Sequence, residues 1–138
     1  MGEAQEPKRI LIVEDDEDNL SVYRTILEHV GYTVLVARDG EDGVRRARVE
    51  RPDLILMDIS LPRLNGWEAT RILKGDAATR DIPVVALTAH ALADDHERSR
   101  AAGCAAHLAK PVEPRKVVSE IERLLGDDGS PGAGEEDD

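Results

Sequence analysis

Acidic, hydroxyl and ammonium side chains stand directly at the ends of four apolar runs of this sequence, the position where open parallel sheets hold their reactive groups. These polar residues are Glu14, Asp15, Asp58, Thr88 and Lys110. Because the carboxyl ends of parallel strands meet at one edge of a sheet, we expect the five side chains to be neighbours. Taken alone, Asp58 is also compatible with an ordinary turn, since aspartate often begins turns.

Three carboxylates at one sheet edge predict chemistry on phosphoryl groups. Two ionised carboxylates about 4 Å apart repel each other by about 4 kcal/mol at an effective dielectric constant of about 20, so the cluster needs a cation or raised pKa values. Oxygen ligands select a hard ion, and Mg²⁺ keeps part of its water shell and accepts phosphate oxygens. Beside Mg²⁺, Asp58 would be a nucleophile toward a phosphoryl group, while Lys110 offsets phosphate charge and the Thr88 hydroxyl donates to a phosphoryl oxygen.

Apolar runs and amphipathic segments are expected to position these residues. The runs, which predict strands, are 10–13, 33–37, 54–58, 83–87 and 104–109. The segments, which predict helices, are 19–30 with Asp18 as cap, one around Val44 and Ala47 that ends before Pro52, one around 69–73, 91–102 and 114–125. The segment 91–102 has a thin apolar stripe, so we expect this helix to be held weakly.

The alternation of these segments predicts the fold class. Strand–helix units that recur about every twenty residues indicate parallel strands joined by right-handed helical crossovers, which is a doubly wound, five-stranded α/β sheet with helices on both faces. We expect one domain over residues 9–125 and a flexible N-terminus over 1–8. Residues 126–138 are rich in glycine and acidic residues and predict a disordered acidic tail.

Composition excludes several classes of partner. A net charge of −11 argues against nucleic acid, and no run approaches the roughly 18 apolar residues of a membrane span. Cys104 is the single cysteine, which excludes an internal disulfide and a cysteine zinc site and fits a reducing cytoplasm. We therefore predict a cytoplasmic protein that binds neither nucleic acid nor membrane.

Four short motifs at the predicted strand ends resemble the receiver domain of bacterial two-component response regulators. They are Ile12-Val13-Glu14-Asp15-Asp16, Leu56-Met57-Asp58-Ile59-Ser60-Leu61-Pro62, Leu87-Thr88-Ala89 and Leu108-Ala109-Lys110-Pro111. The resemblance covers about residues 8–125. It implies the flavodoxin-like (βα)5 fold with strand order 2-1-3-4-5.

The resemblance implies a role for each acidic residue. Asp58 would accept a phosphoryl group from a phosphohistidine on a sensor histidine kinase or histidine phosphotransfer protein. Mg²⁺ would be bound by Asp15, Asp58 and the backbone carbonyl of Ser60, with Glu14 acting mainly through water.

Two further positions match the family's switch hydroxyl and its phosphate-contacting lysine, which are Thr88 and Lys110. The bond from Lys110 to Pro111 is often cis in this family. The residue three before the lysine is usually Tyr or Phe, and here it is His107. We hypothesise that His107 still serves as the ring that turns inward and that it makes signalling somewhat pH-sensitive.

The sequence gives less specific indications of the roles of four other polar or aromatic side chains. Ser60 follows Asp58 by two positions, and His90 follows Thr88 by two positions. Both would flank the phosphoryl group and tune how fast water attacks it. The ordinary polarity of loops explains these two residues equally well. His96 is expected to face solvent, and Trp67 is expected to pack.

Two other functions are compatible with the same fold class. A flavodoxin-like cofactor binder needs a hydroxyl- and glycine-rich loop after the first strand, but residues 14–18 are acidic and would repel phosphate. A phosphatase with an aspartate nucleophile needs a second carboxylate two residues later, where Ser60 stands.

The expected output is reversible contact with a downstream protein target, since no DNA-binding or enzymatic module follows Leu125. The chain would be a single-domain response regulator that catalyses only its own phosphorylation and dephosphorylation. The alternative is a receiver module excised from a hybrid histidine kinase or a larger regulator. Phosphate and Mg²⁺ would bias a pre-existing equilibrium of the loops after the third and fourth strands and of the fourth helix.

Overall fold

The computed structural model describes residues 6–89 and 93–126. Within them, five parallel strands form one sheet in the order β2-β1-β3-β4-β5. The strands are β1 (Arg9–Val13), β2 (Thr33–Ala37), β3 (Leu54–Asp58), β4 (Val84–Thr88) and β5 (Ala106–Ala109). The helices are α1 (Glu17–Val30), α2 (Gly40–Glu50), α3 (Gly66–Lys74), α4 (Ala93–Ala102) and α5 (Pro114–Leu125). The predicted fold class and strand order are confirmed.

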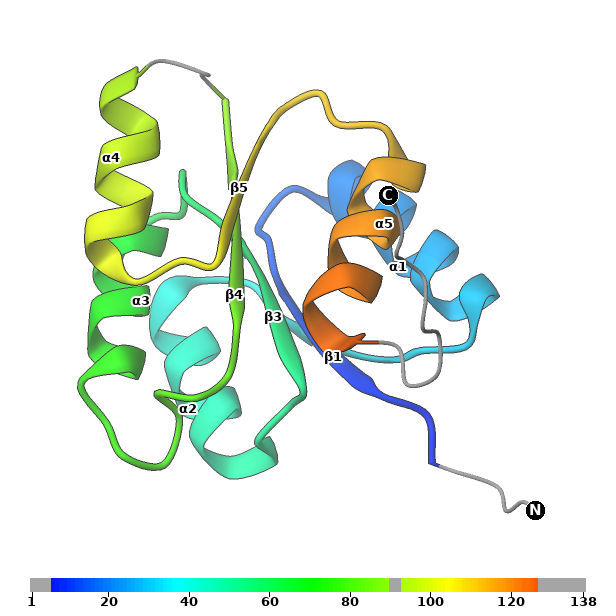
Figure 1. Cartoon of the computed structure of the whole chain (residues 1–138), viewed down its shortest axis with the longest axis horizontal. Helices are drawn as coiled ribbons and strands as arrows, with labels where there is room; N and C mark the ends of the chain where they lie inside the picture. The colour runs from blue at the N-terminus through cyan, green and yellow to red at the C-terminus, as the bar shows by residue number, and fades with distance from the viewer. Residues whose placement is uncertain (1–5, 90–92, 127–138) are drawn as a thin grey trace.

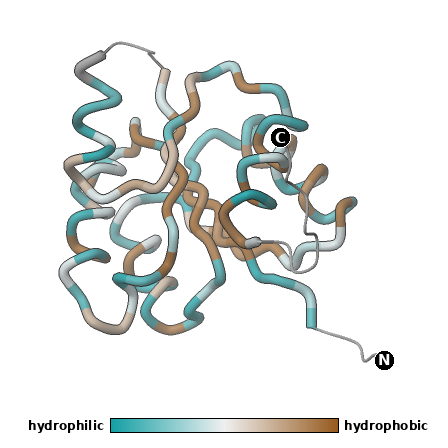
Figure 2. Tube along the Cα trace, in the orientation of Figure 1, coloured by the Kyte–Doolittle hydropathy of each residue, from teal (hydrophilic) through white to brown (hydrophobic). Residues whose placement is uncertain are grey.

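Helices cover both faces of the sheet: α1 and α5 lie on one side, and α2, α3 and α4 on the other (Figure 1). Every residue of β3 and β4 is buried, because a parallel sheet between two helical layers exposes neither face. Figure 2 shows the apolar residues concentrated along the strands, with polar residues on much of the helical surface. This double burial is why the strands appear in the sequence as continuous apolar runs rather than alternating ones.

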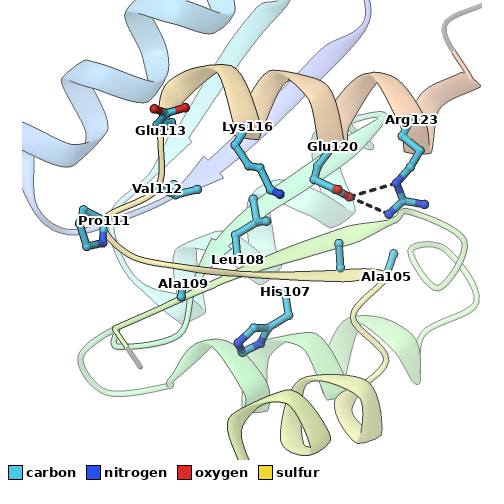
Figure 3. A pocket seen from close by; sticks show the side chains of 11 residues that line it. Ala105, His107, Leu108, Ala109, Pro111, Val112, Glu113, Lys116, Glu120 and Arg123 are labelled. Carbon is cyan, nitrogen blue, oxygen red and sulfur yellow. Dashed lines mark hydrogen bonds and ion pairs between the residues drawn. The ribbon is translucent and has the colours of Figure 1, made fainter. Parts of the chain in front are cut away.

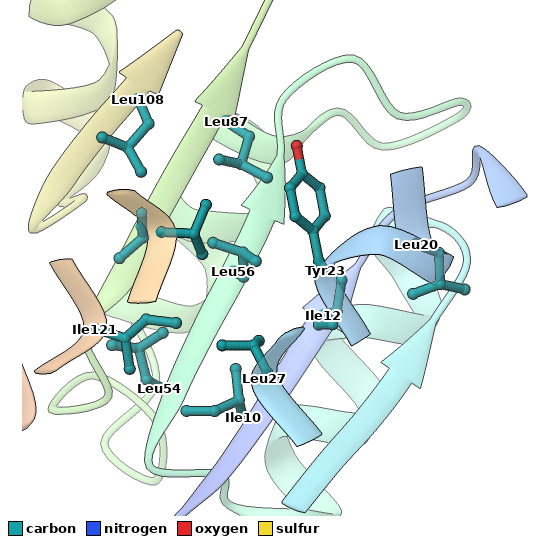
Figure 4. Close-up of a cluster of buried hydrophobic side chains, with 12 residues drawn as sticks. Ile10, Ile12, Leu20, Tyr23, Leu27, Leu54, Leu56, Leu87, Leu108 and Ile121 are labelled. Atoms are coloured by element: carbon teal, nitrogen blue, oxygen red, sulfur yellow. The ribbon is translucent and has the colours of Figure 1, made fainter. Parts of the chain in front are cut away.

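Two apolar clusters fill the space between the sheet and its helices. On the α1 and α5 side, Leu27 and Ile121 pack against strand residues such as Leu56 (Figure 4). On the opposite side, Val44 and Leu73 pack against the other faces of the same strands. Both clusters hold the strands rigidly up to their carboxyl ends.

Helix α1 begins earlier than expected, and Asp18 does not cap it. The side chain of Asp16 accepts hydrogen bonds from the backbone N–H groups of Asp18 and Asn19, at 2.9 and 3.1 Å. The cap shifts because β1 ends at Val13 and leaves only three residues before the first helical turn at Glu17.

Strand β5 is shorter than expected, since it begins at Ala106 rather than Cys104. The backbone N–H of Cys104 donates to the carbonyl oxygen of Ser99 over 2.9 Å, which closes the end of α4. Gly103 has a φ of +103°, a left-handed conformation that favours glycine and turns the chain toward the sheet. Cys104 itself is half-buried.

Several expectations fall on residues outside the described ranges. They concern residues 1–5 of the predicted N-terminus, His90, and residues 127–138 of the predicted acidic tail. Among the described helices, none is long and apolar enough to cross a membrane.

Candidate functional site

Three carboxylates converge where β1 and β3 end. Glu14 and Asp15 directly follow β1, and Asp58 is the last residue of β3. One carboxylate oxygen from each residue lies within 4.8 Å of the other two. Glu14 is fully buried and Asp58 is 2% exposed, whereas Asp15 faces solvent. The structure therefore brings together the acidic residues expected at this edge.

Lys110 brings a positive charge to the same place. It follows β5, and its Nζ lies 3.2 Å from Asp58 Oδ1 and 3.5 Å from Glu14 Oε1. Its backbone N–H donates to the carbonyl oxygen of Thr88 over 2.7 Å, which ties this segment to β4. The bond from Lys110 to Pro111 is cis, as expected. One ammonium group thus contacts both buried carboxylates.

The charges of this cluster are unbalanced. Burial, and then the nearby Asp58, raise the pKa of Glu14 from its ordinary value of 4.5 to about 7, although Lys110 and the backbone N–H of Asp16 oppose the shift. Burial alone would lower the pKa of Lys110, but Asp58 and Glu14 raise it, so its ammonium group stays charged at neutral pH. The two buried carboxylates share one ammonium group beside the exposed carboxylate of Asp15, and a proton or a metal ion would relieve the remaining repulsion.

The donor set of the cluster fits Mg²⁺. Glu14, Asp15 and Asp58 offer only oxygen atoms, which hard divalent cations prefer to nitrogen or sulfur. The pKa of the Glu14 carboxyl is raised first by burial and then by repulsion from Asp58, and such an ion would relieve the repulsion. The exposed Asp15 keeps one side of the cluster open to water, and Mg²⁺ retains several waters when bound. The acidic cluster could therefore hold a metal ion.

The loop after β3 holds the Asp58 carboxylate in place. The backbone N–H of Ser60 donates to Asp58 Oδ1 over 3.1 Å, and that of Ile59 donates to the carbonyl oxygen of Leu87 over 2.9 Å. Gly66, at the start of α3, packs so closely that a Cβ there would lie 2.5 Å from the carbonyl oxygen of Asp58. The backbone of Asp58 is thus fixed between β4 and α3.

Thr88 and His107 lie on adjacent strands and on one face of the sheet. Thr88 pairs with Ala109, and Ala86 pairs with His107, so the two side chains belong to the same set of alternating positions. Thr88 is 3% exposed at the end of β4. The ring of His107 lies on the α4 side of β5 (Figure 3). The two residues thus share one face of the sheet, and their roles in a switch stay predictions.

The other side chains that the sequence analysis singled out lie near Asp58 or His107, or fall outside the described ranges. Ser60 is exposed beside Asp58, and His90 is not among the described residues. His96 is exposed, as expected, but its ring centroid lies 4.1 Å from that of His107. Its position is therefore more specific than that of an ordinary surface histidine.

Sequence reasoning missed Ser99 and Tyr23 and did not foresee the hydrogen bond of Trp67. Ser99 Oγ lies 2.8 Å from His107 Nδ1 and accepts a hydrogen bond from Trp67 Nε1 over 3.0 Å. Tyr23, a buried residue of α1, lines a cavity of about 350 Å³ together with Lys110. Its hydroxyl points toward the carboxyl edge of the sheet (Figure 4). The only signal in the sequence was the presence of hydroxyl and indole groups in otherwise ordinary helical segments.

A separate cavity of about 520 Å³ lies between β5 and α5, where Lys116, Glu120 and Arg123 line it (Figure 3). The carboxylates of the cluster do not line this cavity. It is therefore a surface feature distinct from the acidic cluster.

Known proteins share this sequence pattern along most of the chain. The family described as the response regulator receiver domain matches residues 10–122. The polar-differentiation response regulator DivK of Brucella anthropi is 45% identical over 121 residues, which cover 88% of this chain and 98% of that protein. DivK of Brucella ovis is 43% identical over 120 residues, which cover 87% and 98%.

Two solved structures share the fold and a substantial part of the sequence. The receiver domain of a sensor histidine kinase from Pseudomonas aeruginosa PAO1, which has a magnesium ion coordinated in its active-site cleft, has a TM-score of 0.81 and 39% identity, covering 87% of this chain and 98% of that one. The receiver domain of a histidine kinase from Syntrophus aciditrophicus has a TM-score of 0.81 and 36% identity, covering 87% and 91%. On the strength of its fold, its acidic cluster and these similarities, the chain belongs to the family of response regulator receiver domains of two-component signalling.

Proposed function

We propose that Asp58 accepts a phosphoryl group from a phosphohistidine on a sensor histidine kinase or a histidine phosphotransfer protein, in a magnesium-dependent reaction. The observation that carries this proposal is the contact of one ammonium group, Lys110 Nζ, with the buried carboxylates of Asp58 and Glu14 at 3.2 and 3.5 Å. Buried charges are costly, and clusters with perturbed pKa values gather at functional sites.

The transfer step assigns distinct roles to three side chains. A carboxylate oxygen of Asp58 attacks phosphorus, the P–N bond to the donor histidine breaks, and the electron pair leaves with the imidazole. Lys110 offsets the charge of the phosphoryl oxygens, and the Thr88 hydroxyl donates to one of them. The backbone N–H of Ser60, 3.1 Å from Asp58 Oδ1, keeps the carboxylate oriented.

The other acidic residues serve the metal. Asp15, Asp58 and the backbone carbonyl of Ser60 would hold Mg²⁺, with Glu14 acting mainly through water; when bound, the ion supplies positive charge that stabilises the phosphoryl oxygens. Dephosphorylation follows when water attacks phosphorus and the bond from phosphorus to the Asp58 oxygen breaks. The side chains of Ser60 and His90 would tune the rate of that attack.

Thr88 and His107 would carry the phosphorylation signal away from Asp58. Phosphorylation shifts a pre-existing equilibrium in which the His107 ring moves toward Thr88 and the region around α4 changes. Burial and the neighbouring His96 lower the pKa of His107, while Asp95 opposes the shift. We therefore expect the pH-sensitivity of signalling to lie below about pH 6.5, the ordinary range of histidine.

Two biological settings fit this function. In the first, the chain is a stand-alone regulator that acts through a downstream protein target, which is supported by similarity along 98% of the length of DivK. In the second, it is a receiver module of a hybrid kinase or a larger regulator, as in the kinase of Pseudomonas aeruginosa. In both, the chain modifies only itself, and the cytoplasm stays the predicted location.

Incubation with acetyl phosphate and Mg²⁺, followed by intact mass spectrometry, tests the proposal. We expect an adduct of about 80 Da in the wild type, and its loss in Asp58→Ala or when EDTA removes divalent metal. Asp81→Ala, which changes an exposed aspartate outside the cluster, is the matched control and should be phosphorylated like the wild type. A wild type without an adduct, or an adduct that persists in Asp58→Ala, would refute the acceptor role.

A further inference from the structure

A chain of hydrogen bonds connects α3, α4 and β5 on the side of the sheet where the His107 ring lies. Trp67 Nε1 on α3 donates to Ser99 Oγ on α4 over 3.0 Å, and Ser99 Oγ lies 2.8 Å from His107 Nδ1 on β5. Ser99 is only 1% exposed, so its hydroxyl is largely shielded from bulk water. The hydroxyl therefore joins three secondary-structure elements at one point.

The first bond of this chain has a fixed direction, and the second depends on the tautomer of His107. The indole N–H of Trp67 can only donate, so the Ser99 oxygen accepts and the Ser99 hydroxyl proton is available for His107 Nδ1. Bonds that run in one direction strengthen one another. When the Ser99 hydroxyl donates to His107, Nδ1 is the acceptor and the ring proton of neutral His107 is on Nε2. Within the described part of the chain, Nε2 is buried and has no hydrogen-bond partner.

The surroundings of the ring favour its neutral form. The His96 ring lies 4.1 Å away at an angle of 32°, and a positive charge on both rings would be unfavourable. Burial and His96 lower the pKa of His107, so the ring is neutral at neutral pH and one of its two nitrogens keeps a lone pair.

We propose that Ser99 is a positioning residue, a latch that holds the His107 ring toward α4 with the ring proton on Nε2 and that must release before the ring moves toward Thr88. The ring movement rests on the proposed function above, whereas the latched tautomer does not depend on phosphorylation. Within the described residues, Nε2 has no hydrogen-bond partner while the ring is held toward α4. Movement of the ring would give Nε2 the opportunity to form a hydrogen bond.

A bond that exists in only one of two states biases the equilibrium toward that state, so its loss raises the population of the unlatched state, from which phosphorylation proceeds. Loss of one net hydrogen bond corresponds to roughly a 2- to 10-fold change in an equilibrium constant. Ser99→Ala should therefore raise the initial rate of phosphorylation by acetyl phosphate by roughly 2- to 10-fold.

Two substitutions separate the hydrogen bond from the packing. Ser99→Ala removes the hydroxyl, and Ser99→Cys fills nearly the same space with a weak donor and acceptor. Ser119→Ala, which changes an exposed serine on α5, is the matched control. Each protein is examined by mass spectrometry for its phosphorylation rate, and by long-range ¹H–¹⁵N spectra of its histidine rings at about pH 7.5, where neutral imidazole dominates. The spectrum of His107→Gln identifies the His107 signals by their loss.

We expect an unprotonated Nδ1 in the wild type, a mixture of tautomers in both Ser99 variants, and faster phosphorylation in both. A wild-type ring with its proton on Nδ1 would overturn the proposal, and so would a wild-type rate in Ser99→Cys. If the wild type accepts no phosphoryl group, both the proposed function and the latch are refuted. If wild type and Ser99→Ala react at one rate while Asp58→Ala does not react, only the latch fails.

Discussion

Removal of the Glu14 charge tests the electrostatics of the site most directly. The pKa of Glu14 is about 7 in the folded protein against an ordinary value of 4.5, so between these values the folded state holds a proton that the unfolded state has lost. Stability changes with pH in proportion to the protons bound by the unfolded state minus those bound by the folded state. This difference is negative here, so the free energy of unfolding must fall as pH rises through this window.

The size of the effect follows from the displacement of the pKa. A shift from 4.5 to about 7 corresponds to about 3 kcal/mol at about 1.4 kcal/mol per pKa unit. Most of it, about 2 to 3 kcal/mol, is lost between about pH 5 and about pH 8. Glu14→Gln keeps the size of the side chain but cannot ionise. The variant should therefore lack this component of the pH dependence.

Urea denaturation of wild type and Glu14→Gln at both pH values, in EDTA, measures this difference. Comparing the two pH slopes cancels any effect of the substitution that does not depend on pH. Saturating Mg²⁺ should then stabilise the wild type at about pH 8 more than the variant, because the ion binds the ionised cluster of the folded state. Equal slopes for the two proteins in EDTA would refute the reasoning.

Three further predictions concern other parts of the chain. Asp16→Ala removes the cap of α1 and should lower the free energy of unfolding by about 1 kcal/mol in urea denaturation. Gly66→Ala places a Cβ 2.5 Å from the carbonyl oxygen of Asp58 and should cost at least about 2 kcal/mol in the same assay, whereas Gly75→Ala, with its nearest contact at 3.4 Å, should cost less. His107 has a lowered pKa in the folded state, so the unfolded state binds more protons at acid pH; relative to His107→Gln, thermal melts should show the wild type losing stability as pH falls from about 7.5 to about 5.5.

The positions of the carboxylates could be predicted because they depend on two local facts. Strands buried on both faces appear as continuous apolar runs, and residues 54–58 show such a run that ends in Asp58. Parallel connectivity then brings the residues that follow each strand to one edge. No contact between side chains had to be known in advance.

Contacts between elements could not be predicted in the same way. Asp16 rather than Asp18 caps α1, because in a run of five acidic residues the choice depends on where β1 releases the chain. Ser99 lies in a helix whose sequence is mostly polar, and its burial arises only when α4 docks on α3 and β5. The raised pKa of Glu14 likewise requires the burial and the neighbours that only the folded sheet supplies.

Trp67 is the single tryptophan of the chain, and its contacts make it an intrinsic optical reporter. Its indole N–H is bonded to Ser99, and the guanidinium carbon of Arg98 lies 4.7 Å from its ring centroid. Both contacts come from α4, while the indole itself belongs to α3. A displacement between these helices alters the polarity and the charge around one fluorophore. Its emission can therefore follow phosphorylation or the docking of a partner in the unlabelled protein.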